Sequence, residues 1–452
     1  MKILSFLLLL FLFCAHSQEQ SRPMDPFLKD LQYKSFLYFW ELTNPQNGLT
    51  PDRYPTKSFS SIAAVGFALS SYLVGIEKKF ISREEAAQRV FATLKFFWEA
   101  PQGTDPEKCT GYKGFFYHFL DMETGLRYKD VELSSIDTTL LLAGILSCQV
   151  YFDQDNPLEN QIRDYADKIY LRIDWKWMQA RPPLVSMGWC PEKGFLESDW
   201  KGYNEAMILY ILALASPTHP VSHLSWEAWT KTYLWAEFYG QTHVNFSPLF
   251  GHQYSHVWID FQGIQDEYMK SKGIDYFINS RKAVYSNRAY CMANPSGFKG
   301  YSAEIWGLTA CDGPENAEYV LDGKKQNFQT YWARGASLVE IQDDGTIAPT
   351  AVGGSIPFAP EICIPALKKM NEIHSGKIMG KYGFYDAFNE TYPKTKGNAW
   401  IGPDWLGIDN GPIVLMIENY HSGLLWKWMK KCPYIVSGLK KASFHGGWLD
   451  KN

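Results

Sequence analysis

The sequence lacks a long apolar segment after its first residues and lacks any block of basic residues. No later stretch of about 20 residues, the length that spans a bilayer, is free of charges. The formal net charge is −4, and Lys and Arg gather only in short pairs such as Lys324-Lys325 and Lys430-Lys431. The sequence therefore predicts no integral membrane segment in the mature chain and gives no electrostatic sign of a nucleic-acid partner.

Motifs for metal, serine and nucleotide chemistry are also absent. The pairs His219/His223 and His252/His256 have the i, i+4 spacing of metal ligands, but neither has the Glu of H-E-x-x-H. No G-x-S-x-G elbow and no phosphate-cradling glycine loop occurs. We therefore predict no metal site, no covalent serine chemistry and no nucleotide cofactor.

Cysteines are few and scattered. The seven beyond the N-terminal region form no C-x-x-C pair and show no zinc-finger spacing. In an oxidising compartment one or two disulfides could form, but spacing does not pair the residues, and the odd number leaves at least one free.

The first residues have the three-part layout of a secretory signal. Lys2 precedes an apolar run over residues 3–15, which ends in small and polar residues. We expect residues 1–17 to be removed and the mature protein to be periplasmic or secreted. Cys14 could instead carry a lipid anchor, but Phe13 is bulkier than the side chain that lipoprotein signals normally have there.

The sequence is rich in aromatic residues, with 17 Trp, 27 Tyr and 28 Phe. Aromatic faces suit a protein that binds flat-faced ligands such as sugar rings. An aromatic-rich core explains the same composition equally well, so composition leaves both interpretations open.

Apolar residues at helical spacing predict helices from the start of the mature chain to its end. Three one-faced helices centre near Phe36, Ile62 and Val90, and others follow near Ile162 and Ile413. The segment Gly114 to Tyr128 breaks this pattern and predicts a β-hairpin, and three Gly- and Pro-rich stretches predict long functional loops, residues 294–300, 312–323 and 349–360.

Other helical segments are apolar nearly all round. Residues 138–150 and 207–215 must be buried on every side, while their neighbours are amphipathic. Alternation of enclosed and half-buried helices is what two concentric rings require. We therefore predict an all-α fold, an (α/α)6 toroid of helical hairpins with a small β-hairpin near the cleft, as one domain over residues 18–452.

Acidic residues beside Gly, Pro or aromatics are the candidates for chemistry. Hydrolysis of a glycosidic bond needs one carboxyl that protonates the leaving oxygen and one carboxylate that activates water or attacks the sugar. Such acids stand at helix starts or in loops at five places, Asp137, Glu205, Asp312, Asp404 and Asp409.

Glu205 enters the first turn of an apolar helix after the good cap Asn204. A purely structural role explains this position, because a carboxylate at the N-terminus of a helix is stabilised by the helix dipole. Tyr203 and Trp200 would also desolvate the carboxyl and raise its pKa, as a general acid requires. For Asp409 and Asp137, at the starts of two other helices, capping, a hydrogen-bonded structural role and a cleft position all remain open.

Together, five groups of motifs resemble the glycoamylase-like family, which includes the β-1,2-glucanases of glycoside hydrolase family 144 and is similar to a domain of cyclic β-1,2-glucan synthases. The resemblance spans roughly residues 25–441. The motifs are Ser135-Ile136-Asp137-Thr138 with Leu140 to Gly144, Tyr203-Asn204-Glu205, Trp306 to Ala310 with Asp312-Gly313-Pro314, Gly353-Gly354-Ser355, and Asp409 through Gly411-Pro412 to Tyr420.

The resemblance implies an (α/α)6 toroid, an exported monomer, no cofactor, and hydrolysis of a glucan with inversion. By analogy with helical-toroid glucoamylases, Glu205 is the acid and Asp409 the base, with Asp137 or Asp404 as alternatives for the base. The expected substrate-binding residues are Arg53, Trp189, Tyr203, Trp306, Asp312, Asp404 and Trp405.

Two rival functions remain. A polysaccharide lyase on a similar toroid would use a Tyr or His to abstract a proton from a uronic acid, but the chain has no concentrated basic run for an acidic substrate. A non-catalytic glycan-binding protein would keep the aromatic residues without turnover.

Overall fold

The computed structural model describes residues 24–395 and 397–451. The predicted signal, residues 1–17, lies outside this range. The α-helices are α1 (Pro26–Leu42), α2 (Ile62–Glu77), α3 (Arg83–Glu99), α4 (Ser135–Tyr151), α5 (Pro157–Leu171), α6 (Met207–Ala215), α7 (Leu224–Thr230), α8 (Tyr254–Trp258), α9 (Glu267–Lys272), α10 (Tyr276–Ala293), α11 (Pro349–Gly353), α12 (Pro360–Glu372), α13 (Gly407–Ser422), α14 (Leu424–Met429) and α15 (Pro433–Lys441).

Short 3-10 helices and strands lie between these helices. The 3-10 helices are η1 (Leu249–His252), η2 (Ile373–Gly376), η3 (Pro393–Thr395) and η4 (Leu449–Lys451). The strands are β1 (Arg53–Tyr54), β2 (Ser60–Ser61), β3 (Gly111–Tyr112), β4 (Phe115–Phe116), β5 (Phe119–Leu120), β6 (Leu133–Ser134), β7 (Gly188–Cys190), β8 (Gly194–Phe195), β9 (Trp235–Phe238), β10 (Gln241–Val244), β11 (Ala310–Cys311), β12 (Ala317–Leu321), β13 (Lys324–Phe328), β14 (Trp332–Ala333), β15 (Gly335–Ala336), β16 (Ile341–Gln342), β17 (Thr346–Ile347), β18 (Met379–Gly380), β19 (Gly383–Phe384), β20 (Phe388–Asn389), β21 (Trp400–Ile401) and β22 (Trp405–Leu406).

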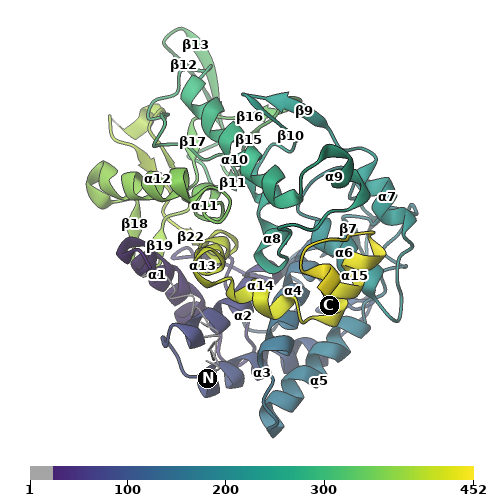
Figure 1. Cartoon of the computed structure of the whole chain (residues 1–452). Coiled ribbons are helices and arrows are strands. Elements are labelled where there is room, and N and C mark those ends of the chain that lie inside the picture. Colours follow the sequence, from purple (N-terminus) through teal and green to yellow (C-terminus); the bar gives the residue numbers. More distant parts are fainter. Residues whose placement is uncertain (1–23, 396, 452) are drawn as a thin grey trace, which may run out of the picture.

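The fold is mainly helical, and enclosed helices alternate with half-buried ones. Helices α4 and α6 are buried on nearly every side, as predicted from their all-round apolar sequences. Helices α1, α3 and α5 bury one face each. Figure 1 shows α2, α4 and α13 inside, with α1, α3, α5 and α12 toward the outside.

The prediction that α2 and α13 are one-faced is wrong. All residues of α2 from Ile62 to Gly75 are buried, and α13 is buried over nearly its whole length up to Asn419. Small and polar residues on the second face of α2 hid its burial from the pattern. One of them, Ser70, bonds to Ser147 of α4 and accepts from the indole of Trp258, so its hydroxyl is satisfied inside the core.

The backbones of α2 and α4 touch at two glycines. A Cβ on Gly144 would lie 2.2 Å from the carbonyl oxygen of Gly66, and a Cβ on Gly66 would lie 2.2 Å from the carbonyl oxygen of Leu140. Backbone atoms cannot rotate away as a side chain could, so only glycine permits this approach.

We expect Gly144→Ala to lower the free energy of unfolding by about 1–3 kcal/mol, because the two helices must separate to admit the methyl group. Denaturation in urea measures the loss. Unchanged stability would contradict the close contact of the two helices.

Short strands stand directly before three enclosed helices. Strand β2 precedes α2 and pairs with β5, β6 precedes α4 and pairs with β7, and β22 precedes α13 and pairs with β1. These pairings tie the loops at the N-termini of α2, α4 and α13 to neighbouring segments. Asp137 of α4 and Asp409 of α13 therefore stand at helix starts that strand pairs hold in place.

Strands are more numerous than the one hairpin predicted. The predicted turn at Asp121–Gly125 is present, since Leu120 and Arg127 bridge in antiparallel fashion across it. Nine further small sheets accompany the one that contains β5 in the described residues. The prediction of a loop over residues 349–360 is wrong, because Pro349–Gly353 form α11 and Pro360 begins α12.

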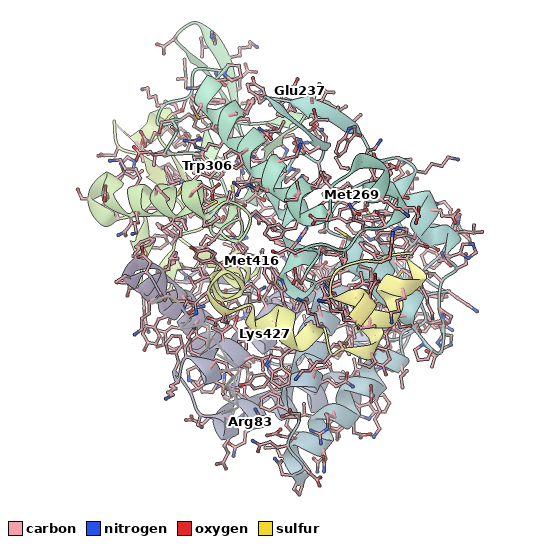
Figure 2. All side chains as sticks on the ribbon, viewed as in Figure 1. Arg83, Glu237, Met269, Trp306, Met416 and Lys427 are labelled. Carbon is pink, nitrogen blue, oxygen red and sulfur yellow. The ribbon has the colours of Figure 1, made fainter. Side chains whose placement is uncertain are left out.

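One cluster of buried apolar residues extends from Leu28 to Leu449, and side chains fill the space between the ribbons (Figure 2). The seven cysteines from Cys109 to Cys432 are all buried and free, so they form no disulfide with one another. Within residues 24–395 and 397–451, no helix is both long and apolar enough to span a membrane.

Candidate active site

Acidic side chains from distant segments gather at the N-terminal ends of the enclosed helices. Asp137 lies in the first turn of α4, Glu205 two residues before α6, and Asp409 in the first turn of α13. Further acids lie in neighbouring loops, Asp52, Asp312, Asp386 and Asp404. Arg53 links Asp52, Asp312 and Asp404, and Asp312 donates from its backbone N–H to Asp386.

Arg53 joins three of the acids. Its Nη1 lies 2.7 Å from Asp312 Oδ2 and 3.9 Å from Asp404 Oδ2, and its Nε lies 3.2 Å from Asp52 Oδ2. Burial alone would lower the pKa of Arg53, but the carboxylates of Asp312 and Asp52 raise it overall. The arginine side chain is 26% exposed, so it presents a fixed cation to a ligand in the cleft.

Glu205 is half-buried, and one oxygen of its carboxyl group lacks a hydrogen-bond partner. Its Oε2 is buried and has no hydrogen-bond partner. Burial raises the pKa of Glu205 to about 7, and the charge of Asp137 adds to the rise. Near neutral pH the group therefore exists in both protonation states, which suits a proton donor.

Asp409 shares its environment with Asp386, a residue that the sequence motifs do not single out. Both residues line one small cavity, which also borders Asn410. Burial raises the pKa of Asp386 to about 7, with a contribution from the charge of Asp312. Burial and the charge of Asp386 raise the pKa of Asp409 well above its usual value.

Asp137 faces a histidine that the sequence analysis also missed. His118 Nε2 lies 3.5 Å from Asp137 Oδ2, and His118 Nδ1 lies 2.9 Å from Glu132 Oε1. Burial alone would lower the pKa of His118, but Asp137 and Glu132 raise it to about 9. Ser134 is the N-cap of α4: its hydroxyl accepts from the backbone N–H of Asp137 and donates to the Asp137 carboxylate, so the carboxylate is hydrogen-bonded but does not itself cap the helix. A cation and a hydroxyl thus hold Asp137.

Tyr254, at the start of α8, lies among the candidate catalytic acids. Burial raises the pKa of its hydroxyl well above the usual value, and the charges of Asp409, Glu205 and Asp137 add to the rise. The hydroxyl of this one buried tyrosine is therefore near enough to all three carboxyl groups for their charges to act on its pKa. The structure brings Glu205, Asp137 and Asp409 to one region, with Arg53, Asp312 and Asp404 linked to it through Asp386.

The predicted aromatic sugar contacts are mostly wrong. Trp306 is 0% exposed and Tyr203 is 4% exposed, so neither offers a free ring face. Trp405 is covered by Tyr385, whose ring stacks 4.3 Å away. Only Trp189, in β7, is partly exposed, and it packs beside Tyr112 and Trp177. Stacking needs an accessible ring, which the sequence does not report.

Tyr331 is an aromatic residue of the site that the sequence analysis missed. Its side chain is 52% exposed. Burial of its hydroxyl and the charges of Asp409, Asp386 and Asp52 raise its pKa well above the usual value. Tyr331 is therefore an exposed aromatic residue near Asp409, Asp386 and Asp52.

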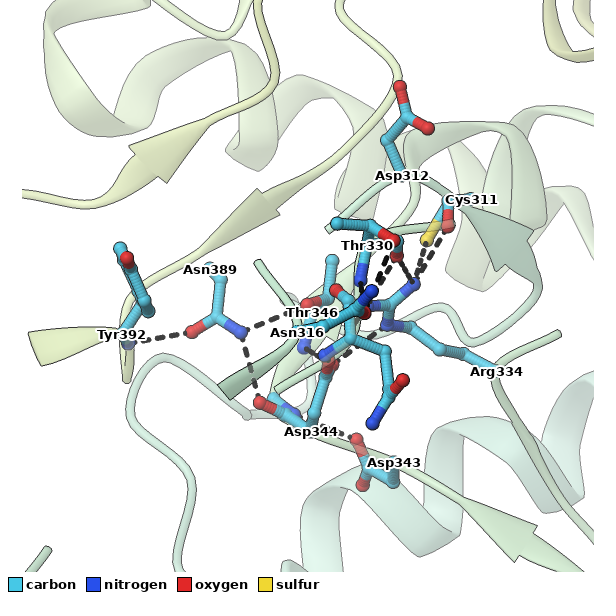
Figure 3. Close-up of polar contacts among 12 residues, drawn as sticks. Cys311, Asp312, Asn316, Thr330, Arg334, Asp343, Asp344, Thr346, Asn389 and Tyr392 are labelled. Atoms are coloured by element: carbon cyan, nitrogen blue, oxygen red, sulfur yellow. Dashed lines mark hydrogen bonds and ion pairs between the residues drawn. The ribbon is translucent and has the colours of Figure 1, made fainter. Parts of the chain in front are cut away.

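A buried arginine holds the loops that carry Asp312 and Tyr331 (Figure 3). Arg334 donates to both carboxylate oxygens of Asp344 at 2.8 and 2.7 Å. It also donates to the carbonyl oxygens of Cys311 at 2.7 Å and of Gln329 at 2.8 Å. Because Cys311 precedes Asp312 and Gln329 is two residues before Tyr331, this network fixes two walls of the site.

Metal ligation finds no support in residues 24–395 and 397–451, where no group of three or more His, Cys, Asp or Glu is arranged to hold an ion. His252 and His256 are buried, and burial lowers the pKa of both. His256 bonds to Ser280, and His252 is near the carbonyl of Phe246. Both histidines are core residues.

Known proteins match nearly the whole chain. The Glycoamylase family model, described as "Putative glucoamylase", matches residues 197–433. An exo β-1,2-glucooligosaccharide sophorohydrolase (non-reducing end) of Parabacteroides distasonis is 29% identical over 445 residues, which cover 91% of this chain and 57% of the relative. The chain therefore spans little more than half the length of that curated relative.

Solved structures agree with the family match. The endo-β-1,2-glucanase of Chitinophaga pinensis has a TM-score of 0.79 and 31% identity, covering 93% of this chain and 98% of that one. A β-1,2-glucanase of Parabacteroides distasonis has a TM-score of 0.79 and 29% identity, covering 92% of this chain and 59% of that one. With a family model over more than half of its length and a relative above 30% identity over nearly all of it, the chain belongs to the glycoamylase-like family.

Proposed function

We propose that the protein is an exported glycoside hydrolase that cleaves β-1,2-glucan with inversion of the anomeric carbon. The observation that carries this proposal is the carboxyl of Glu205, whose pKa of about 7 lets it act as a proton donor beside other buried acids. The relatives named as β-1,2-glucan hydrolases supply the linkage.

In the proposed reaction Glu205 gives its proton to the glycosidic oxygen as the bond from that oxygen to the anomeric carbon breaks. A water oxygen bonds to the anomeric carbon from the opposite face, and the proton that this water loses goes to a carboxylate. Asp409 is our candidate for that carboxylate. Asp137, held by His118 and Ser134, is the second candidate.

Arg53 is proposed to contact sugar hydroxyls from the rim of the acid cluster, with Asp312 and Asp404 fixed beside it. A partly exposed guanidinium that is paired with buried carboxylates keeps its position and still has donors to offer. Tyr331 is proposed to supply the accessible aromatic face that Trp306, Tyr203 and Trp405 do not.

The proposed frame is a single domain, residues 18–452, with an (α/α)6 arrangement, in a monomer. Its inner ring would consist of α2, α4, α6, α8, α11 and α13. Contacts of α13 with α2, α8 and α11, and of α4 with α2 and α6, support this ring.

Export is tested by recovering the protein from the periplasm or the medium and sequencing its N-terminus, which should lie after residues 1–17.

We expect incubation with β-1,2-glucan to release saccharides whose new reducing end is first the α-anomer, because inversion of a β-linkage gives α. NMR of the anomeric protons during the first minutes measures this, and β-1,3- and α-1,4-glucans serve as matched controls. An initial β-anomer would contradict inversion. Ultraviolet-absorbing unsaturated ends would indicate a lyase, and binding without new reducing ends would indicate a binding protein.

A further inference from the structure

Asp386 occupies the junction of the acid cluster. Its backbone N–H donates to the carbonyl of Asp404 at 3.0 Å, and its Oδ2 accepts from the backbone N–H of Asp312 at 2.6 Å. Asp386 and Asp409 line the same small cavity. With 4% exposure, this side chain lies between the Arg53 group and the start of α13.

A role in holding the Asp312 loop accounts for Oδ2 of Asp386, which accepts from that loop, but not for Oδ1. Its Oδ1 is buried without a partner, as are Oδ2 of Asp409 and Oδ1 of Asn410. All three residues line one cavity of about 10 Å³, which holds at most one water molecule. Among the described residues no ion pair is formed with Asp386 or Asp409, because the nearby Arg53 is paired with Asp312. A proton held between the two carboxyls would relieve their repulsion.

Two carboxyl groups in contact inside a protein do not both ionise, so the pair keeps one proton over a wide pH range. The charged and titratable groups around the pair are Asp312, Arg53, Asp52, Tyr38, Tyr254, Tyr331 and Cys311, and Tyr385 lines the same cavity. Among them, only Arg53 favours ionisation of the pair, and it is bound to Asp312.

We propose that Asp386 is a positioning residue that holds one proton in common with Asp409 and thereby sets the pH above which Asp409 accepts a proton from water. The kinetic part of this inference rests on the proposed function, with Asp409 as the base. Asp386 itself touches no reacting atom.

The test is Asp386→Asn. The side-chain oxygen of the asparagine can still accept from the backbone N–H of Asp312, and the substitution removes the like charge of Asp386 from beside Asp409. We expect the acidic limb of the profile of kcat/KM against pH to move down by about one pH unit or more, with KM within about twofold of the wild type. An unmoved limb would overturn the inference.

Asp266→Asn is the matched control. Asp266 is also buried, its pKa is also raised by burial, and it accepts from Trp226 and Tyr276, away from the cleft acids. This variant should keep the wild-type limb. If it shifts the profile as far as Asp386→Asn does, the shift reports a general loss of structure and the inference fails.

A stability titration separates this inference from the proposed function. The pKa values of Asp386 and Asp409 are raised above those of the unfolded chain, so the folded state binds more protons, and the free energy of unfolding falls as pH rises from about 4 to about 7. Asp386→Asn should remove much of that fall, and Asp409→Asn should do so too, even if the wild type cleaves no glucan. If the free energy of unfolding of both variants fell with rising pH by as much as that of the wild type, the inference of a shared proton would be overturned.

Discussion

Glu205→Gln lowers kcat for β-1,2-glucan by about 10²–10⁴-fold and leaves the fold intact, since glutamine fits the same space but cannot give a proton to the leaving oxygen. Initial rates of release of reducing ends measure kcat, and circular dichroism checks the fold. KM should change little, because the carboxyl acts on the transition state more than on the bound ground state.

The pH dependence should carry the signature of the same carboxyl. With a pKa of about 7, Glu205 loses its proton as pH rises through neutrality, so wild-type activity should fall up to about tenfold per pH unit above that value. Leaving groups that need no protonation, such as fluoride, should restore activity to Glu205→Gln.

Glu197→Gln is the control for this prediction, since Glu197 is an exposed acid on the segment that leads to the same helix. It should keep the wild-type kcat. Full activity in Glu205→Gln would remove Glu205 as the acid, and the fold assignment would be unaffected.

The sequence predicts enclosed helices only where the apolar residues run all round. Helices α4 and α6 fulfil this condition, and both are predicted correctly. In α2, Ser70 and Gly66 lie in the core because one bonds across to α4 and the other admits its backbone. Both reasons are tertiary, so no periodicity reveals them. Strands of two residues are likewise too short to show a period of two.

The sequence indicates members of the candidate site where an acid coincides with a recognisable local structure. Glu205 and Asp409 stand at helix starts, and Arg53, Asp312 and Asp404 lie together as an ion-paired group. His118 and Asp386 enter only through contacts with distant residues, so their segments alone give no signal. Trp306 and Tyr203 stand in motifs that the sequence singles out but pack inward, and the abundance of aromatic residues does not tell which ring faces are exposed.

Arg334→Met should cost about 3–5 kcal/mol of unfolding free energy, because it leaves the Asp344 carboxylate buried without its cation. Both side chains are 0% exposed. The loss should appear in urea denaturation. The variant that remains folded should also show a lower kcat/KM. The loops that carry Asp312 and Tyr331 lose the hydrogen bonds that Arg334 donates to the carbonyl oxygens of Cys311 and Gln329.

The ion pair of Arg181 with Asp199 is the matched control. The distance between their charged atoms is also 2.7 Å, but the arginine side chain is 45% exposed, so Arg181→Met should cost no more than about 1 kcal/mol of unfolding free energy.

The loss of unfolding free energy in Arg334→Lys should lie between those of Arg334→Met and Arg181→Met. An ammonium keeps the charge but cannot reach two carbonyls and both carboxylate oxygens at once. Replacing both partners, Arg334→Met with Asp344→Leu, should recover stability relative to Arg334→Met alone while activity stays low. Equal losses for Arg334→Met and Arg181→Met would refute the bracing role, because burial is what distinguishes the two pairs.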